Sequence, residues 1–151
     1  MTAVTGRVQR ILLGVDGSVE SSRAAAFAAT LAAQLDAEVV AVHAVGLLDV
    51  WPEDTSAPHG RNSHLHVREL VEGAWTESVR AAGVRLRTVL RDGPPSIVLL
   101  DTAEEVDADL IVIGSRGIGQ ADLYALGSTT ARITETSSRP VVVVPSIRPE
   151  T

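Results

Sequence analysis

The residues best suited to bind a phosphate group lie between positions 114 and 129. Gly114 and Gly117 are followed, after nine residues, by Gly127-Ser128-Thr129. Glycine lets the backbone approach a ligand closely, and the unpaired amides at the start of a helix attract an anion. The hydroxyls of Ser128 and Thr129 add donors. The spacing favours a phosphate site, although a tight strand exit without a ligand accounts for the same glycines, with Ser128 then acting only as a helix cap.

Asp16 and Arg116 are the charged residues beside the predicted loops. Asp16 lies in the stretch Gly14-Val15-Asp16-Gly17-Ser18, between an apolar run and a helical pattern. Its carboxylate is either favoured by the dipole of the following helix or contacts a base, a ribose or a magnesium ion held by phosphate. Arg116 either pairs with phosphate or is solvated. The residue types leave both pairs of alternatives open.

Other residues that could do chemistry give weaker signals. His43 ends an apolar run and is expected to be structural, and Trp51 and Trp75 are expected to pack rather than to stack on bases. Without cysteine, three histidines of an irregular segment favour zinc only weakly: His59, His64 and His66. No Gly-x-Ser-x-Gly elbow and no acid–base pair of carboxylates stands out. The pattern therefore favours binding over turnover.

The composition excludes several function classes. All 13 basic residues are arginine, so a phosphate loop with a Gly-Lys pair and Schiff-base chemistry are excluded. The absence of cysteine excludes thiol catalysis. A net charge of −6 argues against binding to nucleic acid or to an anionic membrane. No apolar run reaches the roughly 18 residues of a membrane span, and no signal peptide is evident. We expect one domain over residues 1–151, located in the cytoplasm.

Short apolar runs alternate with segments of helical period along the chain. Strands are expected at residues 10–15, 38–45, 84–90, 109–113 and 140–145. Helices are expected after Ser18 and at residues 64–82, 96–106 and 128–136, and residues 46–63 are expected to be irregular. This alternation predicts an α/β fold, an open parallel sheet with helices on both faces. Ligands bind beyond the carboxyl ends of such strands, where strand order reverses, so the first and fourth strands should flank the site.

The residue types at the ends and on the faces of these helices give finer predictions. Ser18 is predicted to cap the first helix, and Phe27 is predicted to face the core together with the neighbouring alanines and leucines. Gly83 should end the second helix. The third helix should bury Ile97 and Leu100.

The chain resembles the universal stress protein family, whose ATP-binding members carry glycine, two residues, glycine, nine residues, glycine and then serine or threonine. The matching residues are Gly114, Gly117, Gly127 and Ser128. Residues 11–18, 42–45, 93–94 and 139–144 are also similar to family segments. The resemblance implies a Rossmann-like sheet of five parallel strands in the order 3-2-1-4-5, with a bound adenine nucleotide. ATP, with Mg²⁺, is the expected form, and cAMP or AMP is the alternative.

The resemblance also implies roles for individual residues. Asp16 and the backbone near Ala44 would hold the adenosine end, and the two glycine segments would hold ribose and phosphates. The implied nucleotide-binding residues are Gly14, Asp16, Ala44, Gly114, Arg116, Gly117, Gly127, Ser128 and Thr129. A homodimer would form through the closing strand, which comprises Val141, Val142, Val143 and Val144, since an unpaired edge strand can pair with a second copy.

The function implied by the resemblance is that of an ATP-binding, ligand-responsive stress module. Two alternatives stay open: the same fold without nucleotide binding, acting through protein partners, and a weak ATP hydrolase. The segment from Leu47 to Leu65 varies within the family, so the resemblance predicts nothing for it.

Overall fold

Five parallel strands form one sheet in the order β3-β2-β1-β4-β5, which confirms the predicted fold class. The structure is a computed structural model that describes residues 6–45, 61–117 and 126–147. In this part of the chain the elements are β1 (Arg10–Gly14), α1 (Val19–Leu35), β2 (Glu38–Val45), α2 (Arg61–Glu72), the 3₁₀ turn η2 (Ala74–Thr76), α3 (Glu77–Ala81), β3 (Leu86–Asp92), α4 (Pro95–Glu105), β4 (Leu110–Gly114), α5 (Ser128–Thr136) and β5 (Val141–Val144).

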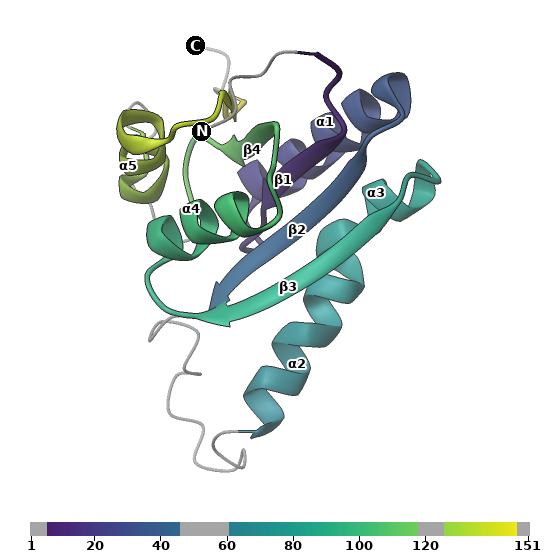
Figure 1. Ribbon diagram of the computed structural model, residues 1–151. Helices are drawn as coiled ribbons and strands as arrows, with labels where there is room; N and C mark the ends of the chain where they lie inside the picture. The colour runs from purple at the N-terminus through teal and green to yellow at the C-terminus, as the bar shows by residue number, and fades with distance from the viewer. Residues whose placement is uncertain (1–5, 46–60, 118–125, 148–151) are drawn as a thin grey trace.

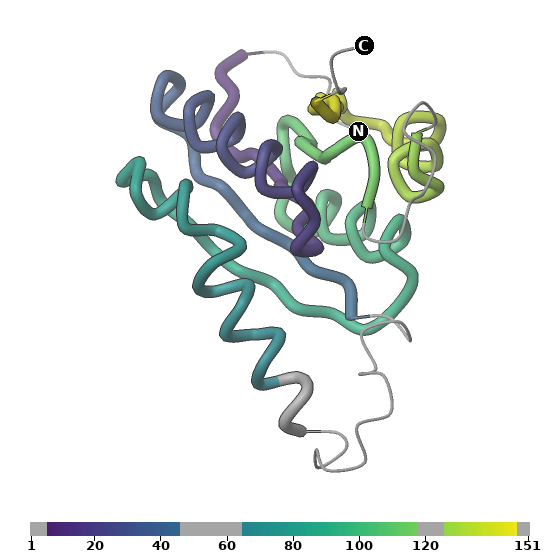
Figure 2. The backbone as a smooth tube through the Cα atoms, turned by 180° about the vertical axis from the view of Figure 1, so that it is seen from behind, coloured from purple at the N-terminus to yellow at the C-terminus, as the bar shows by residue number. Residues whose placement is uncertain are grey.

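Helices cover both faces of the sheet. Consecutive side chains of a strand point to opposite faces, so Ile11 and Leu13 of β1 pack with α1, α2 and α3, whereas Leu12 packs with α4 and α5. Figure 1 shows α4 and α5 on the near face, and Figure 2 shows α1, α2 and α3 on the opposite one. Because both faces are buried, the central strands are almost entirely apolar, with His43 as the buried polar residue of β2.

The first helix packs on the sheet through small residues. Ser18 caps it as predicted, because the Ser21 N–H donates to the Ser18 Oγ over 3.0 Å. The buried stripe is made of Ala24, Ala25, Ala28, Ala29 and Ala32. These side chains let the helix lie close to the strands, so larger residues occupy its flanks. The prediction that Phe27 faces the core is wrong, since Phe27 lies beside this stripe and is 42% exposed.

The helix α4 presents a different face to the sheet from the one predicted. It begins with Pro95 in its first turn, a position that proline favours. Val98 and Leu99 are buried, whereas Ile97 is 53% exposed. The prediction that Ile97 is buried is therefore wrong, because the helix turns the next two residues inward. Leu100 is partly buried against the same cluster.

The single helix predicted over residues 64–82 is instead two helices separated by a 3₁₀ turn. The first of them begins earlier than predicted, at Arg61, and ends at Glu72. Gly73 then adopts φ −115° and ψ −110°, outside the helical region, so the prediction of one continuous helix is wrong. Gly83 follows α3 with φ 71°, the left-handed conformation expected of a glycine that ends a helix.

The two edges of the sheet are β3 and β5. β3 begins at Leu86 rather than at residue 84, and its Arg87 pairs with Glu38 of β2 over 2.8 Å. β5 pairs with β4 in the register Ile111↔Val141 to Gly114↔Val144. Among the described residues, no helix has both the length and the apolar character needed to cross a membrane.

Candidate nucleotide site

The predicted site residues lie where β1, β2 and β4 end. β1 pairs with β2 on one side and with β4 on the other, so the strand order reverses between β1 and β4. This is where parallel sheets place their ligands. The Val15 N–H donates to the Val42 carbonyl over 3.0 Å. That bond holds the start of the loop containing Asp16 against the end of β2, close in sequence to Ala44.

Asp16 and Gly117 come from different loops and lie close together at the carboxyl ends of the strands. A Cβ atom added to Gly117 would lie 2.6 Å from Asp16 Oδ2. The other carboxylate oxygen, Oδ1, accepts the Ser18 N–H over 2.9 Å, and the Asp16 N–H donates to Ser21 Oγ over 3.1 Å. The carboxylate is thus held at the start of α1, where the helix dipole favours it, and it also faces the loop of residues 114–117, here called the glycine loop.

The start of α5 lies directly against the glycine loop. The Gly127 N–H donates to the Ser115 carbonyl, and Thr130 Oγ1 donates to the Gly114 carbonyl, each over 2.8 Å. Gly127 is the N-cap residue and has no side chain to serve as a cap, so the interpretation of Ser128 as only a cap is wrong. Ser128 is exposed. The first-turn amides of α5 have no acceptor within the helix and can bind an anion.

The glycines of the predicted phosphate pattern are also packed against protein atoms. A Cβ atom at Gly114 would lie 2.8 Å from the carbonyl carbon of Glu20 in α1, and one at Gly127 would lie 3.3 Å from the Cα of Arg116. Close packing alone accounts for Gly114, whereas at Gly127 a methyl group needs only a small shift of its neighbours. Gly117 differs, because its closest neighbour is the end of a side chain that can rotate. Packing therefore explains Gly117 less well than it explains Gly114.

Gly14, Ala44 and Thr129 have different surroundings. A Cβ atom at Gly14 would lie 2.6 Å from Leu99 Cδ2 of α4, and Ala44 is 7% exposed. Both residues can therefore offer only main-chain atoms to a ligand. Thr129 is half-buried in the first turn of α5.

Arg116 is not solvated, so that interpretation of the sequence is wrong. Its side chain is 7% exposed, and its Nη2 lies 2.6 Å from Oε1 of Glu20. Nη2 and Nε donate to Ser146 Oγ over 2.7 and 3.0 Å, and this hydroxyl donates to Glu20 over 2.9 Å. Ser146 Oγ also lies 3.0 Å from Ser115 Oγ. These four residues, here called the Arg116 cluster, engage the guanidinium with protein groups.

The Arg116 cluster keeps Glu20 ionised. Burial raises the pKa of Glu20, but hydrogen bonds from its own backbone N–H and from Ser146, together with Arg116, outweigh burial and hold this pKa below the ordinary value of 4.5. The positive charge of Arg116 is therefore balanced by a carboxylate at neutral pH.

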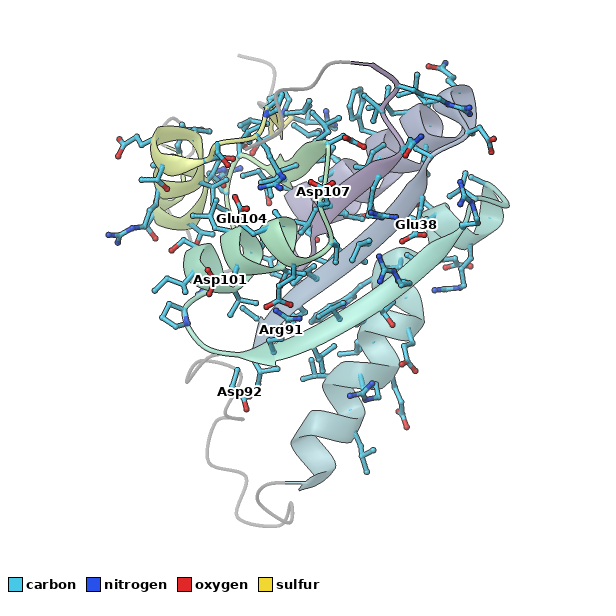
Figure 3. All side chains as sticks on the ribbon, in the orientation of Figure 1. Glu38, Arg91, Asp92, Asp101, Glu104 and Asp107 are labelled. Carbon is cyan, nitrogen blue, oxygen red and sulfur yellow. The ribbon has the colours of Figure 1, made fainter. Side chains whose placement is uncertain are left out.

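A second arginine near the site is also neutralised by the protein. Arg91 of β3 is the register partner of Ala44 and donates a hydrogen bond to Glu105 of α4. Figure 3 shows Arg91 between β3 and α4, on the side of the helix that carries Asp101. The hydrogen bond to Glu105 raises the pKa of Arg91. The ion pair of Arg91 and Glu105 therefore connects β3 to α4.

His43 and Trp75 have the structural roles that the sequence predicts. His43 is buried, and its Nδ1 lies 2.7 Å from the Val15 carbonyl. Its ring contacts the Trp75 ring edge-on at a centroid distance of 5.1 Å, and the partly buried indole packs against the core cluster that includes the alanines of α1. Trp75 also lies against Gly17, where a Cβ atom would be 2.5 Å from Cζ2. The pair therefore supports the loop that carries Asp16.

The weak prediction of a zinc site falls mostly outside the described residues. His59 and Trp51 lie there, and the side chain of His64 is also not described. Within the described ranges, no group of three or more histidine, aspartate and glutamate side chains is arranged to hold a metal ion.

Three residues of the site were not predicted from the sequence: Glu20, Thr130 and Ser146. Thr130 follows the predicted hydroxyl pair directly, and its position on the inner face of α5 was the available signal. Glu20 and Arg116 are separated by 96 positions and Ser146 and Arg116 by 30. No local pattern reveals such a contact.

Comparison with known proteins gives a consistent result. The model of the universal stress protein family matches residues 7–145. A universal stress protein of Synechocystis sp. is 36% identical over 120 residues, covering 76% of each chain, and one of Methanocaldococcus jannaschii is 32% identical over 143 residues, covering 90% of this chain and 81% of the relative. The crystal structure of a universal stress protein in complex with cAMP superposes with a TM-score of 0.72 at 25% identity, covering 93% of this chain and 98% of that one. The chain belongs to the universal stress protein family.

Proposed function

We propose that this protein is a ligand-responsive stress module that binds an adenine nucleotide at the carboxyl ends of β1, β2 and β4. One observation carries the proposal: three separate segments meet there, since Asp16 faces Gly117 and the Gly127 N–H is bonded to Ser115. The similar universal stress protein solved in complex with cAMP supports an adenine nucleotide as the ligand.

In this proposal the two ends of the nucleotide contact different loops. Asp16 and the main chain near Ala44 contact the adenosine end of the nucleotide. Gly14, at the end of β1, contributes main-chain atoms to the same part of the site. The phosphate accepts hydrogen bonds from the main-chain N–H groups of the glycine loop and from the first turn of α5. The hydroxyls of Ser128 and Thr129 complete this set of donors, all of which are neutral.

ATP is the form that the sequence resemblance implies, and cAMP and AMP are the alternatives. A bound Mg²⁺ would neutralise part of the triphosphate charge. In the alternative in which Asp16 does not contact the adenosine end, its carboxylate, a hard oxygen donor of the type that Mg²⁺ prefers, would be an outer ligand of this ion.

Binding is tested on the purified full chain. Mass spectrometry of small molecules released on denaturation should detect an adenine nucleotide, and calorimetry should give saturable binding of ATP with Mg²⁺, cAMP or AMP. Gly117→Val should abolish binding, because its side chain displaces the Asp16 carboxylate, while circular dichroism stays unchanged. A folded wild-type protein that binds none of the three would overturn the proposal.

One observation favours a second candidate function, the same fold acting through protein partners without a nucleotide. Gly114 is required by packing against the main chain of Glu20, so this glycine would persist in a chain that has no ligand. The same calorimetry separates the two candidates, because only the first predicts heat on addition of a nucleotide.

We further propose that two copies pair through β5. Its residues Val141, Val142, Val143 and Val144 form an edge of the sheet, and three of the four are only half-buried. An apolar edge with unpaired peptide groups is suited to pair with an identical strand.

A further inference from the structure

We propose that Glu20 and Ser146 are positioning residues of the nucleotide site, which set the conformation of the glycine loop by holding Arg116. The proposal rests on the proposed function in one respect, that the glycine loop contacts the ligand. It assigns to Arg116 a bracing role in place of a direct contact with phosphate.

The Arg116 cluster engages two of the three guanidinium nitrogens, Nε and Nη2. Nη2 bonds to both Glu20 and Ser146, Nε bonds to Ser146, and Ser146 donates its own proton to Glu20. The Ser146 hydroxyl is therefore acceptor for the cation and donor for the carboxylate at the same time. Its contact with Ser115 Oγ ties a second residue of the glycine loop to the same group.

Burial makes this arrangement costly to open. The side chains of Arg116 and Glu20 are 7% and 14% exposed. Breaking a buried ion pair by removing one partner leaves a charge that is poorly compensated, and this is strongly unfavourable. If the Arg116 side chain turned toward a phosphate, the Glu20 carboxylate would lose its ion-pair partner. We therefore infer that the guanidinium stays with Glu20 when a ligand is bound.

The cluster connects the glycine loop to both elements that flank the end of β4. Glu20 lies in the first turn of α1, and the Cβ that Gly114 lacks would press on its main chain. Ser146 follows β5, and Arg23 of α1 donates to the neighbouring Pro145 carbonyl over 3.0 Å. The loop is thus fixed from the helix on one side and from the segment after β5 on the other.

A second group of the same residue types, with a more exposed glutamate, serves as the control for this cluster. Arg139 pairs with Glu104 over 2.6 Å, and Ser138 Oγ donates to the same Glu104 oxygen over 3.1 Å. This second arginine–glutamate–serine group braces α4 against the segment before β5, and Arg139 also bonds to the Ala108 carbonyl ahead of β4. Figure 3 labels Glu104 at the end of α4. This second group lies near the amino ends of the strands, whereas the glycine loop lies at their carboxyl ends.

The experiment compares Glu20→Gln, Ser146→Ala and Ser146→Thr with Glu104→Gln. Two quantities are measured in each full-length variant: hydrogen exchange of the peptide covering residues 114–117, and the affinity for AMP and for ATP with Mg²⁺. We expect Glu20→Gln and Ser146→Ala to speed hydrogen exchange in that peptide. Both variants should also lower the affinity for each nucleotide by about tenfold, the effect of losing one charged hydrogen bond. Ser146→Thr, which keeps the hydroxyl, should restore both values, and Glu104→Gln should change neither.

Each other outcome overturns the proposal in a different way. Tighter nucleotide binding by Glu20→Gln would show that Glu20 competes with phosphate for Arg116. Unchanged exchange and affinity in both Glu20→Gln and Ser146→Ala would show that the cluster does not set the loop. Equal losses in Glu104→Gln would show a general effect of stability. If wild-type protein binds no nucleotide, the proposed function fails, and the exchange data alone decide whether Glu20 and Ser146 position the loop.

Discussion

At the scale of single residues, Gly114 and Gly117 differ in what a side chain would meet. A methyl group at Gly114 would press on the main chain of Glu20, which cannot move without shifting α1. At Gly117 it would press on Asp16 Oδ2, the end of a side chain. The first glycine therefore serves packing between helix and strand, and the second sets the shape of the candidate site.

Alanine substitutions should separate these two roles. We expect Gly114→Ala to lower the free energy of unfolding by about 1–3 kcal/mol, the usual cost of an overpacked contact. Gly117→Ala should cost less than about 1 kcal/mol and should weaken nucleotide binding, because the Asp16 carboxylate is displaced. Denaturant unfolding and calorimetry measure the two effects. An equal loss of stability in both variants would contradict this assignment.

At the scale of elements, the direction of the peptide groups in β5 decides how its pairing can be tested. The Val144 carbonyl accepts the Ser115 N–H over 2.9 Å, so Val144 faces β4. Because peptide groups alternate in direction along a strand, Val142 also faces β4. The N–H groups of Val141 and Val143 therefore point outward, away from β4.

Proline at position 143 should disrupt the proposed dimer selectively. Val143→Pro removes an outward N–H and leaves the hydrogen bonds to β4 in place, so we expect monomers in light scattering. Val143→Ala keeps the N–H and should remain dimeric. A dimeric proline variant would place the interface elsewhere on the molecule, and a monomeric wild-type chain would remove the dimer altogether.

The break between α2 and α3 is held by two side chains. Thr76 is fully buried, and its Oγ1 donates to the Val71 carbonyl and accepts from Arg80 Nη1, each over 2.6 Å. Arg80 Nη1 also donates to the Glu72 carbonyl over 2.7 Å. The carbonyls released where α2 ends thus keep hydrogen-bond partners.

Removing the Thr76 hydroxyl should therefore be destabilising. Thr76→Val is expected to lower the free energy of unfolding by about 1–3 kcal/mol, because the Val71 carbonyl loses the hydroxyl that donates to it and Arg80 loses one of its acceptors. Thr134→Val, on the exposed side of α5, is the control and should change stability by less than about 0.5 kcal/mol. Urea unfolding monitored by circular dichroism provides the measurement. Similar losses in the two variants would show that the break does not depend on this hydroxyl.

At the scale of the whole molecule, the sheet and the loop positions could be predicted because burial leaves a clear pattern. Strands covered on both faces are continuous apolar runs, and Gly83 and Ser18 carry the chemistry of helix ends. The break at Gly73 could not be predicted, since the apolar spacing continues across it. The exposure of Phe27 and Ile97 depends on how each helix is rotated on the sheet, which the periodicity alone does not determine.

The loops of the candidate site could be predicted from the sequence, whereas the contacts between them could not. The sequence predicted that the glycine loop and Asp16 lie together, because both follow the carboxyl ends of neighbouring parallel strands. The partners of Arg116 depend on the path of the chain, which brings α1 and the segment after β5 to the same loop. That path becomes visible only in the folded protein.

Acid should destabilise the whole molecule through carboxylates with a lowered pKa. The pKa of Glu104 lies below 4.5 because of Arg139 and Ser138, that of Glu105 because of Arg91, and that of Glu20 is lowered as described above. The unfolded chain binds these protons more tightly, so their stabilisation is complete above pH 4.5 and is lost as the pH falls through the folded-state values. We expect urea midpoints to decline below pH 4.5, and less steeply in Glu20→Gln. An identical decline in that variant would contradict the contribution of Glu20.

Trp75 also gives the molecule a built-in optical reporter. Its indole lies against Gly17 in the loop that carries Asp16, and against His43 at the end of β2. The chain has two tryptophans, so replacing Trp51 with phenylalanine leaves one emitter, placed behind the candidate site. Its emission should shift when a ligand moves that loop, and binding could then be followed in real time without attaching a dye.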